Sequence, residues 1–415
     1  MTGPLWTRLP DGWLTGRVKN VATVTLGKML QSKDGGSDVS APYMRAANVQ
    51  PDGLLALDDV NEMWFGEAEL EQLSIRAGDV VVVEGGQGGF GRAAYVENDL
   101  PGWGFQNSIN RLRPIDDFDG RFIAFYLIAL RASGYIRAYS NVVSMPHLTA
   151  EKLARVPIPL PPVEQQRAIA DYLDRETARI DTLIEEQQRL IEMLRERRNA
   201  VVNRAIRRGV VNAPMNDSGD PLIGDIPDGW SVVPIRRVAT SLDSRRIPLS
   251  AEERAERSGP FPYYGATSVI DHVDDFIFDE SLVLVAEDGF GLLYRSKPIA
   301  IHVEGRIWVN NHAHVLRPLA VPSRLLAARI ESESLVPYIG GSRQPKLTAE
   351  ALMGMRISIP PEDQWSQILA VLGDETAKID TLVSETERFI ELSRERRSAL
   401  ITAAVTGQID VREVA

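Results

Sequence analysis

The side chains that could do chemistry in this chain are mainly arginine, lysine and amide groups in its less apolar stretches. Arginine and amide groups can form paired hydrogen bonds with base edges, whereas lysine and hydroxyl groups bind the phosphate backbone. This chemistry makes them candidates for DNA contact. The candidates are Arg45, Arg92, Asn107, Ser144, His147, Arg245, Arg246, Asn311, Arg343, Gln344 and Lys346. For any one of them, a solvated surface group is the alternative interpretation.

A glycine-rich run at residues 85–91, GGQGGFG, contains the spacing G-x-G-x-x-G at Gly86, Gly88 and Gly91. A dinucleotide-binding loop with this spacing must open a helix. The residues that follow, RAAYV, continue as a strand, so we expect a tight hairpin turn instead of a phosphate site. A further interpretation is a backbone loop close to DNA, with Phe90 and Phe290 packing beneath it.

Signatures of several enzyme classes are missing from the sequence. No lysine follows Asp or Glu by two positions, which removes the D/E-x-K motif of metal-dependent nucleases, and no Walker A run occurs. The Asn-Pro-Pro-aromatic and Asp-Pro-Pro-aromatic runs of amino-methyltransferases do not occur either. His312 and His314 lack a third ligand, so two neighbours on a strand are favoured over a zinc site. We therefore predict a chain without catalytic residues, metal or cofactor of its own.

Composition sets further limits. The 415 residues allow two or three domains, and the absence of cysteine excludes disulfides and thiolate metal sites. The formal net charge of −11 argues against a chain that coats nucleic acid by bulk charge. The first residues, MTGPLWTRLPDGW, have no apolar signal core, and no apolar run reaches the length of a membrane span. We therefore expect a cytoplasmic protein.

The candidate residues must be positioned by a scaffold that occurs twice. The stretch from Pro161 to about Gly209 aligns without a gap with the stretch from Pro360 to about Gln408, at a shift of about 199 residues. Each copy lacks internal proline and repeats apolar residues at steps of three and four, which predicts one long helix. The predicted apolar stripe comprises Ile169, Leu173, Ile180, Leu183, Leu190, Leu194, Val201 and Ala205 in the first copy, and Leu372, Ile379, Leu382, Phe389, Leu400 and Ala404 in the second.

A helix this long cannot bury a narrow stripe on itself, so we expect the two copies to pair. Polar residues interrupt the stripe at matched places, Glu176 with Glu375 and Gln187 with Thr386. They are either tolerated seam residues or a lock on the register. The block RERR occurs in both helices and is either a solvated face or a docking site for a partner protein. Its candidate docking residues are Arg195, Arg197, Arg198, Arg394, Arg396 and Arg397.

The segments ahead of the two helices share a frame as well. LPDGW at 9–13 matches IPDGW at 226–230, FQNSINRLRP at 105–114 matches VNNHAHVLRP at 309–318, and MPHLTAEKL at 145–153 matches QPKLTAEAL at 344–352. The loops within that frame differ, as a reader of two different targets would require. The expected division is a first domain at 1–158, a helix at 159–210, a linker at 211–224, a second domain at 225–357, a helix at 358–408 and a tail at 409–415.

The order and duplication of these motifs resemble the specificity (S) subunit of type I restriction–modification enzymes. The supporting runs are PDGW, IPLPPVEQQ at 158–166, ETARID and RERR, repeated as PDGW, ISIPPEDQW at 357–365, ETAKID and RERR. The resemblance implies an α+β fold of two mixed α/β target recognition domains, separated by an antiparallel coiled coil of two long helices with a pseudo-two-fold repeat. It implies a non-catalytic subunit whose halves each read one part of a bipartite, asymmetric double-stranded DNA target, with the coil setting the spacer.

The resemblance also implies partners. Two modification subunits would bring S-adenosylmethionine chemistry, and restriction subunits would add ATP and Mg for translocation and cleavage. Because the chain itself is acidic, we expect tight DNA binding to need the modification subunits. The second copy has Glu-Asp-Gln-Trp where the first has Val-Glu-Gln-Gln, which leaves any contact of that glutamine pair open. The alternatives are the S subunit of a type II enzyme of the same architecture, and a coiled-coil scaffold that binds protein only.

Overall fold

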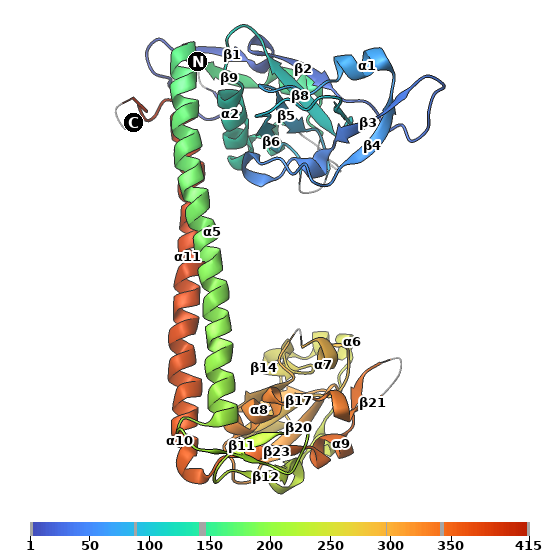
Figure 1. Cartoon of the computed structure of the whole chain (residues 1–415), viewed down its shortest axis with the longest axis vertical. Coiled ribbons are helices and arrows are strands. Elements are labelled where there is room, and N and C mark those ends of the chain that lie inside the picture. Colours follow the sequence, from blue (N-terminus) through green and yellow to red (C-terminus); the bar gives the residue numbers. More distant parts are fainter. Residues whose placement is uncertain (1–2, 87–88, 141–146, 296, 341–343, 413–415) are drawn as a thin grey trace. The chain divides into compact units, whose positions relative to one another are not determined.

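The computed structural model describes residues 3–86, 89–140, 147–295, 297–340 and 344–412. The chain divides into two compact units, one formed by residues 1–188 with 387–415 and the other by residues 189–386. Each unit contains one α/β domain and parts of the two long helices (Figure 1). Among the described residues, no helix combines the length and apolar character that crossing a membrane requires.

The first unit is built on an antiparallel sheet of order β2-β8-β5-β6, with helix α2 packed on one face (Figure 1). Its central strand β5 explains the valine run in the sequence. Val80 and Val82 belong to the core that includes α2, whereas Val81 and Val83 belong to a second core on the opposite face. Because side chains alternate along a strand, a strand that is covered on both faces needs an uninterrupted apolar run.

The bounds of the first unit's sheet and helices are as follows. The main sheet comprises β2 (Ala22–Leu26), β8 (Ile109–Pro114), β5 (Val80–Val83) and β6 (Ala93–Tyr95); a second sheet of order β4-β3-β7 comprises β4 (Asn61–Phe65), β3 (Val39–Met44) and β7 (Gly104–Phe105). β1 (Leu14–Arg17) pairs with β9 (Pro157–Leu160), which leads into the first long helix. The helices are α1 (Glu67–Gln72), α2 (Gly120–Ala132), α3 (Tyr135–Tyr139) and α4 (Ala150–Arg155). Thr149 caps α4 through a hydrogen bond from the Lys152 amide.

The second unit repeats this frame. Its main sheet has the equivalent order β13-β20-β17-β18, with β13 (Ala239–Ser241), β20 (Ala313–Pro318), β17 (Leu282–Ala286) and β18 (Ala300–Val303). A second sheet comprises β15 (Val269–Val273), β14 (Ser258–Tyr264), β19 (Arg306–Val309) and β16 (Phe278–Asp279), and β12 (Ser231–Pro234) pairs with β23 (Arg356–Ile359). The helices are α6 (Ala251–Glu256), α7 (Gly291–Tyr294), α8 (Ser323–Ser332) and α9 (Ala349–Gly354). The predicted duplication of a mixed α/β domain is confirmed.

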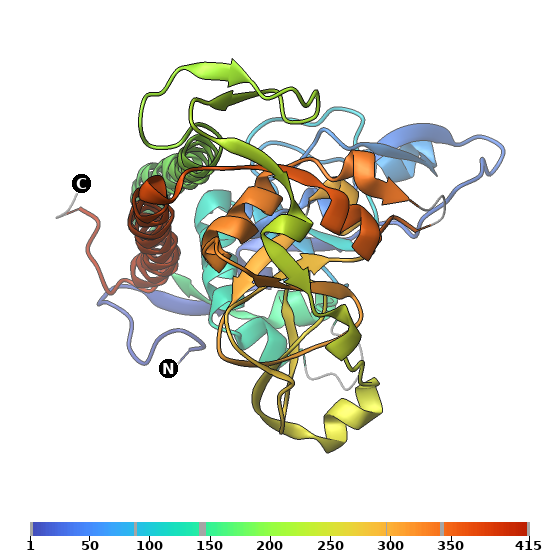
Figure 2. The same cartoon turned by 90° about the horizontal axis from the view of Figure 1, so that it is seen from below.

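The stretch expected as a linker is folded. Strands β10 (Met215–Asp217) and β11 (Asp225–Pro227) form an antiparallel hairpin at the margin of the second unit (Figure 2). Its turn uses Gly219 and Gly224, both with positive φ, and the Asp220 side chain accepts a hydrogen bond from the Leu222 amide. The Asn, Asp, Gly and Pro residues that suggested a linker are therefore used for tight turns within one hairpin.

The first long helix, α5, runs from Val163 to Arg208, directly after the Pro161–Pro162 pair. The second copy has α10 (Glu362–Ala370), a π-helical stretch at Val371–Glu375 and α11 (Thr376–Val405). The π-helical stretch contains Gly373, which has a low helix propensity. In each unit α5 and the second helix run antiparallel, as predicted (Figure 1).

At several places, the residue buried on the seam between the helices is the neighbour of the residue predicted for the stripe. Buried residues recur at alternating steps of three and four, the period of a left-handed coiled coil. They are Ala170, Leu173, Thr177, Ile180, Ile184 and Ile191 on α5, and Thr376, Ile379, Thr386, Ile390, Ser393, Arg397 and Ala404 on α11. Leu382 and Phe389 flank the seam and are exposed, so their assignment to the stripe was wrong. Near the start of each helix, the polar residue buried on the seam is the threonine that follows Glu176 or Glu375. The 3.5-residue period of the seam turns the glutamate itself outward.

The seam hydroxyls satisfy themselves within their own helices. Thr177 donates to the Leu173 carbonyl at 2.7 Å, and Thr386 donates to the Leu382 carbonyl at 2.7 Å. These residues therefore make no bond that would fix the register. Ion pairs between the helices do so instead, since Arg198 on α5 pairs with Asp380 on α11 at 2.7 Å. The seam threonines are therefore better interpreted as tolerated polar residues than as a lock on the register.

Equivalent side-chain hydrogen bonds hold each domain to the start of its long helix. The Trp13 indole donates to Gln165 at 2.7 Å, and the equivalent Trp230 donates to Gln364 at 3.2 Å. The next position differs in chemistry but keeps its contact. Gln166 donates to the Pro161 carbonyl at 2.9 Å, and in the second copy the Trp365 indole donates to the equivalent Pro360 carbonyl at 2.8 Å. The change from Gln166 in the first copy to Trp365 in the second therefore replaces one hydrogen-bond donor to this carbonyl by another.

Candidate nucleic-acid interface

In each domain, the loop after the buried central strand meets the segment that leads into the last short helix. In the first domain the Leu148 amide donates to the Glu84 carbonyl at 2.7 Å, and His147 Nδ1 lies 2.9 Å from the Glu84 carboxylate. In the second domain the Leu347 amide donates to the Glu287 carbonyl at 2.8 Å. The Lys346 ammonium lies 3.1 Å from the Glu287 carboxylate. The predicted residues His147 and Lys346 therefore occupy equivalent, exposed positions.

A buried polar side chain lies beneath each of these positions. Asn110 on β8 donates to the Leu148 carbonyl at 2.8 Å. At the equivalent place on β20, His314 Nε2 lies 2.8 Å from the Leu347 carbonyl, and its Nδ1 lies 2.6 Å from Asp243. Leu347 belongs to β22 (Lys346–Leu347), which pairs with β21 (Ile339–Gly340). The two domains thus hold the same segment by different chemistry.

The two predicted arginines of the second domain have different environments. Arg246 is largely buried and donates to Glu287 at 2.5 Å and to the Ala313 carbonyl at 2.7 Å. Burial alone would raise the pKa of Glu287, but hydrogen bonds from Arg246 and Lys346 outweigh it, so the pKa lies below its ordinary value. Arg245 is more exposed and lies over the Phe278 ring at 4.7 Å. Arg246 therefore holds the loops. Arg245 donates to the Ile277 carbonyl at 2.9 Å, and its contact with DNA stays a prediction.

The remaining candidates of the first domain contact different residues. Arg45 is half-buried and pairs with Asp59 at 2.5 Å, and Arg92 donates to the Val49 carbonyl at 3.3 Å. The Asn107 amide makes no side-chain hydrogen bond to another described residue, and the same holds for Asn311 and Gln344 in the second domain. For these three amides, contact with DNA stays a prediction. Ser144 and Arg343 lie outside the described residues.

Sequence reasoning missed an aromatic pair on the second domain. The rings of Phe290 and Tyr294 are stacked with centroids 6.3 Å apart, and the two residues are 56% and 77% exposed. Phe290 was expected to pack beneath its loop, and that expectation was wrong. Phe90 in the first domain does pack against the core. The difference arises because β6 begins at Ala93, whereas α7 intervenes before β18 at Ala300, and the extra turn of helix displaces Phe290 from the core.

The glycine run and the histidine pair have the simpler roles. After Gly91 the chain continues into strand β6, which pairs antiparallel with β5, and it opens no helix there; Gly88 lies outside the described residues. His312 contacts Asp288 at 2.9 Å and His314 contacts Asp243 at 2.6 Å, so the two histidines do not share a site. Among the described residues, no group of three or more His, Asp or Glu side chains is placed to hold a metal ion.

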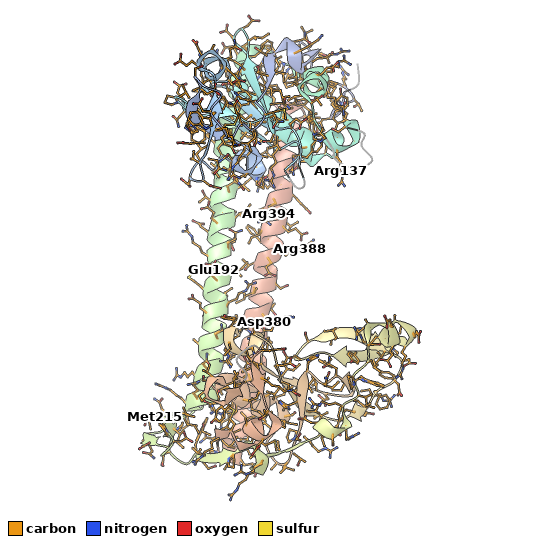
Figure 3. The ribbon with its side chains drawn as sticks, turned by 90° about the vertical axis from the view of Figure 1, so that its right-hand side faces the viewer. Arg137, Glu192, Met215, Asp380, Arg388 and Arg394 are labelled. Atoms are coloured by element: carbon orange, nitrogen blue, oxygen red, sulfur yellow. The ribbon has the colours of Figure 1, made fainter. Side chains whose placement is uncertain are left out.

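The RERR blocks contain two kinds of arginine. Arg198 and Arg397 turn toward the other helix and form ion pairs within the chain. Arg197, Arg394 and Arg396 are exposed, and Figure 3 shows Arg394 and Arg388 extending from α11 and Glu192 from α5. Arg195 is exposed as well. The outward arginines keep the docking role as a prediction, whereas Arg198 and Arg397 hold the helix pair together.

A duplicated α/β domain, fastened to an antiparallel helix pair and carrying different polar loops in each copy, defines a two-part recognition protein. The chain belongs to the family described as type I restriction modification DNA specificity domain, whose pattern matches residues 10–193 and 227–387. Both copies of the repeat are therefore covered by the family.

Two relatives and two solved structures illustrate the similarity. The type I restriction enzyme specificity subunit S.HindORF215P of Haemophilus influenzae is 33% identical over 145 residues, which are 35% of this chain and 37% of that protein. The type I restriction enzyme MjaVIII specificity subunit of Methanocaldococcus jannaschii is 20% identical over 313 residues, 70% of each chain. A chain from a study of assembly and conformational transition of the type I R-M system has a TM-score of 0.70 at 17% identity, covering 97% of this chain and 100% of its own. The HsdS subunit of Thermoanaerobacter tengcongensis has a TM-score of 0.55 at 16% identity, covering 97% and 98%. The two structures share the fold.

Proposed function

We propose that the chain is the DNA sequence-recognition subunit of a type I restriction–modification system, and that each domain reads one half of a bipartite, asymmetric double-stranded target. The observation that carries this proposal is the combination of one repeated frame with different chemistry at its loops. The segment held by Asn110 in the first domain is held by His314 in the second. Two copies of one reader with unequal loops suit two unequal half-sites.

The paired helices act as a ruler in this proposal. The test removes one heptad from each helix, residues 184–190 from α5 and residues 383–389 from α11, which are equivalent in the repeat. A heptad deletion keeps the seam and shortens each helix by about 10 Å, or about three base pairs of DNA. Sequencing of methylated positions in cells that carry the variant should show a shorter spacer and unchanged half-sites.

A control deletion separates the ruler from simple damage. Removing residues 184–187 and 383–386 takes four residues from each helix and turns the seam residues away from one another. This variant should lower the unfolding temperature and abolish methylation. An unchanged spacer in the heptad variant would contradict the ruler. If the helices set the distance between the two domains, shorter helices must shorten the DNA spacer between the half-sites.

The chain contributes placement in this proposal, and its partners contribute the chemistry. Two modification subunits would supply S-adenosylmethionine chemistry, and restriction subunits would use ATP and Mg. The purified chain should therefore transfer no methyl group to target duplex, whereas the complex with modification subunits should. Because the chain has a net charge of −11, it should bind the duplex more weakly alone than in that complex. Equal affinity in gel shifts with and without the modification subunits would contradict this point.

The outward face of the helices is the proposed docking site for the modification subunits. Arg396 on α11 is exposed one turn beyond Leu392, which is 47% exposed, and Arg394 is exposed on another side of the helix. The equivalent face of α5 carries exposed Arg197 and Met193. One such face in each copy of the repeat suits two identical partners. Arg394→Glu with Arg396→Glu should lower co-purification of the modification subunits. Arg388→Glu is a second test of this face, because Arg388 lies one turn before Leu392 and pairs with Glu391 at 3.3 Å.

A further inference from the structure

Exposed aliphatic side chains gather in the loop that follows β2 in the first domain. Met29 is 75% exposed and Leu30 is 57% exposed, and Leu26 at the end of β2 is exposed as well. Single apolar residues scattered over a surface are ordinary, whereas three within five residues of one loop indicate a contact site. The pair Met29 and Leu30 forms the most exposed part of this loop, and what it contacts is not explained by the fold.

Backbone hydrogen bonds fix the chain on both sides of this aliphatic pair. Before the pair, the Lys28 amide donates to the Phe105 carbonyl at 3.0 Å, and the Lys28 carbonyl accepts from the Asn107 amide at 2.7 Å. After the pair, the Gln31 carbonyl accepts from the Trp64 amide at 3.1 Å. The pair is therefore held in place before any ligand binds, which lowers the entropy that is lost on binding.

The same hydrogen bonds join the aliphatic pair to the candidate DNA-binding residues of this domain. Asn107 is followed by Ser108, whose carbonyl accepts from the Glu84 amide at 2.8 Å. The Glu84 carboxylate in turn contacts His147 at 2.9 Å. The ends of β2, β5 and β8 that carry these loops lie at one edge of the main sheet. The aliphatic pair is thus continuous with the candidate nucleic-acid interface.

The second domain keeps an exposed aliphatic residue at the matching place. The two PDGW runs are 217 residues apart, and this shift matches Leu30 with Ile247 and Met29 with Arg246. Ile247 is 48% exposed, and its carbonyl accepts from the Trp308 indole at 2.6 Å. The neighbouring residue changes from methionine to a largely buried arginine, yet the exposed aliphatic position is repeated. An apolar contact is therefore common to two loops that otherwise differ.

The chemistry of the loop favours DNA as the occupant over a partner protein. Leu30 and Met29 have no strong hydrogen-bonding group, so they suit the apolar faces of bases and not their edges. Lys33 is exposed in the same loop and makes no ion pair with another described residue, which suits a phosphate. A stable protein interface takes about 20–30 residues on each side, far more than this loop offers.

We propose that Leu30 with Met29 in the first domain, and Ile247 in the second, are apolar wedges that enter between two base pairs of their half-site and partly unstack them. The inference rests on the proposed function, because it concerns how each domain reads its half-site. A wedge reads no base edge. It favours steps that unstack easily, such as pyrimidine–purine steps, so it adds specificity through the deformability of the DNA.

The first experiment measures the affinity of the complex with modification subunits for a duplex with the methylome-defined target. Met29→Ser with Leu30→Ser should lower this affinity about tenfold and leave the unfolding temperature unchanged. On a duplex with the first half-site scrambled, the double variant and the unmutated complex should bind equally. Leu14→Ser is the matched control, because Leu14 is also exposed but lies on β1, which pairs with β9 and not with the main sheet. Loss of co-purification of the modification subunits in the double variant would identify a protein contact and overturn the proposal.

The second experiment observes the unstacking itself. The fluorescent base 2-aminopurine replaces each purine of the first half-site in turn, except the methylated base, which a methyltransferase extrudes from the stack on its own. Saturating unmutated complex should raise the fluorescence at one step, and the double variant should not. Specific binding without such a rise, or an equal rise with the double variant, would overturn the wedge alone. Absence of specific binding by the unmutated complex would refute the proposed function, and the wedge with it.

Discussion

The Arg397 guanidinium on α11 lies 2.9 Å from the Asp181 carboxylate on α5, and the repeat places Arg198 2.7 Å from Asp380 in the same way. The residue numbers of the two pairs add up to the same total, as one antiparallel register requires. The pairs differ in burial, because the Arg397 side chain is 8% exposed and that of Arg198 is 39% exposed. Arg397 also donates to the Asp52 carbonyl at 3.1 Å and so ties the helix pair to the first domain.

This difference predicts unequal costs for the same substitution. Arg397→Ala should destabilise the first unit by about 1–3 kcal/mol, because it removes charged hydrogen bonds at a buried position. Arg198→Ala should cost less than about 1 kcal/mol, since its pair is open to solvent. Calorimetric unfolding of the full chain measures both. Equal costs would show that burial of the arginine does not control the strength of these pairs.

The exchange of Gln166 for Trp365 predicts a second effect. Trp365→Phe keeps an aromatic ring but removes the donor to the Pro360 carbonyl, so it should cost about 1 kcal/mol in unfolding free energy. Trp103→Phe is the matched control, because the Trp103 indole makes no hydrogen bond to another described residue and is only partly buried. If both substitutions cost the same, the Pro360 contact contributes nothing beyond ring packing.

The carboxylates beneath the second domain's loops predict acid sensitivity. Burial alone would raise the pKa of Asp243, but hydrogen bonds from His314 and the Val315 amide and the charge of Arg246 outweigh it, so the pKa lies below its ordinary value. A lowered pKa in the folded state stabilises the fold fully above the ordinary value near 4 and is lost as pH falls through the folded value. Unfolding temperature should therefore drop below about pH 4, and Asp243→Asn should make that drop shallower. An equally steep drop in the variant would contradict the assignment.

The aromatic pair of the second domain predicts a separation of stability from binding. Phe290→Ala with Tyr294→Ala should change stability by less than about 0.5 kcal/mol, because both rings are exposed. If the rings stack on bases, DNA affinity of the complex should fall about tenfold or more. Phe90→Ala should show the reverse, a loss of about 1–2 kcal/mol in stability with little effect on affinity, since Phe90 packs on the core. Unchanged affinity in the double variant would remove the pair from the interface.

Short-range patterns were enough to predict the frame. The duplication, the two long helices, the buried valine run of β5 and the capping of α4 by Thr149 all follow from periodicity or from neighbours in the sequence. The same patterns placed His147 and Lys346 in equivalent positions, since the repeat carries one frame into both domains. These features depend on interactions between residues a few positions apart, which a sequence displays directly.

Tertiary packing decided the rest. Thr177 and not Glu176 lies on the seam because the partner helix sets a 3.5-residue period, which a single helix of 3.6 residues per turn does not reveal. Arg397 and Arg394 belong to one RERR block, yet one is buried in an ion pair and the other is exposed. His314 contacts the Asp243 carboxylate and the Leu347 carbonyl, which belong to segments far away in the chain. Burial and long-range partners are properties of the folded chain, so residues of one type in one motif acquired different roles only there.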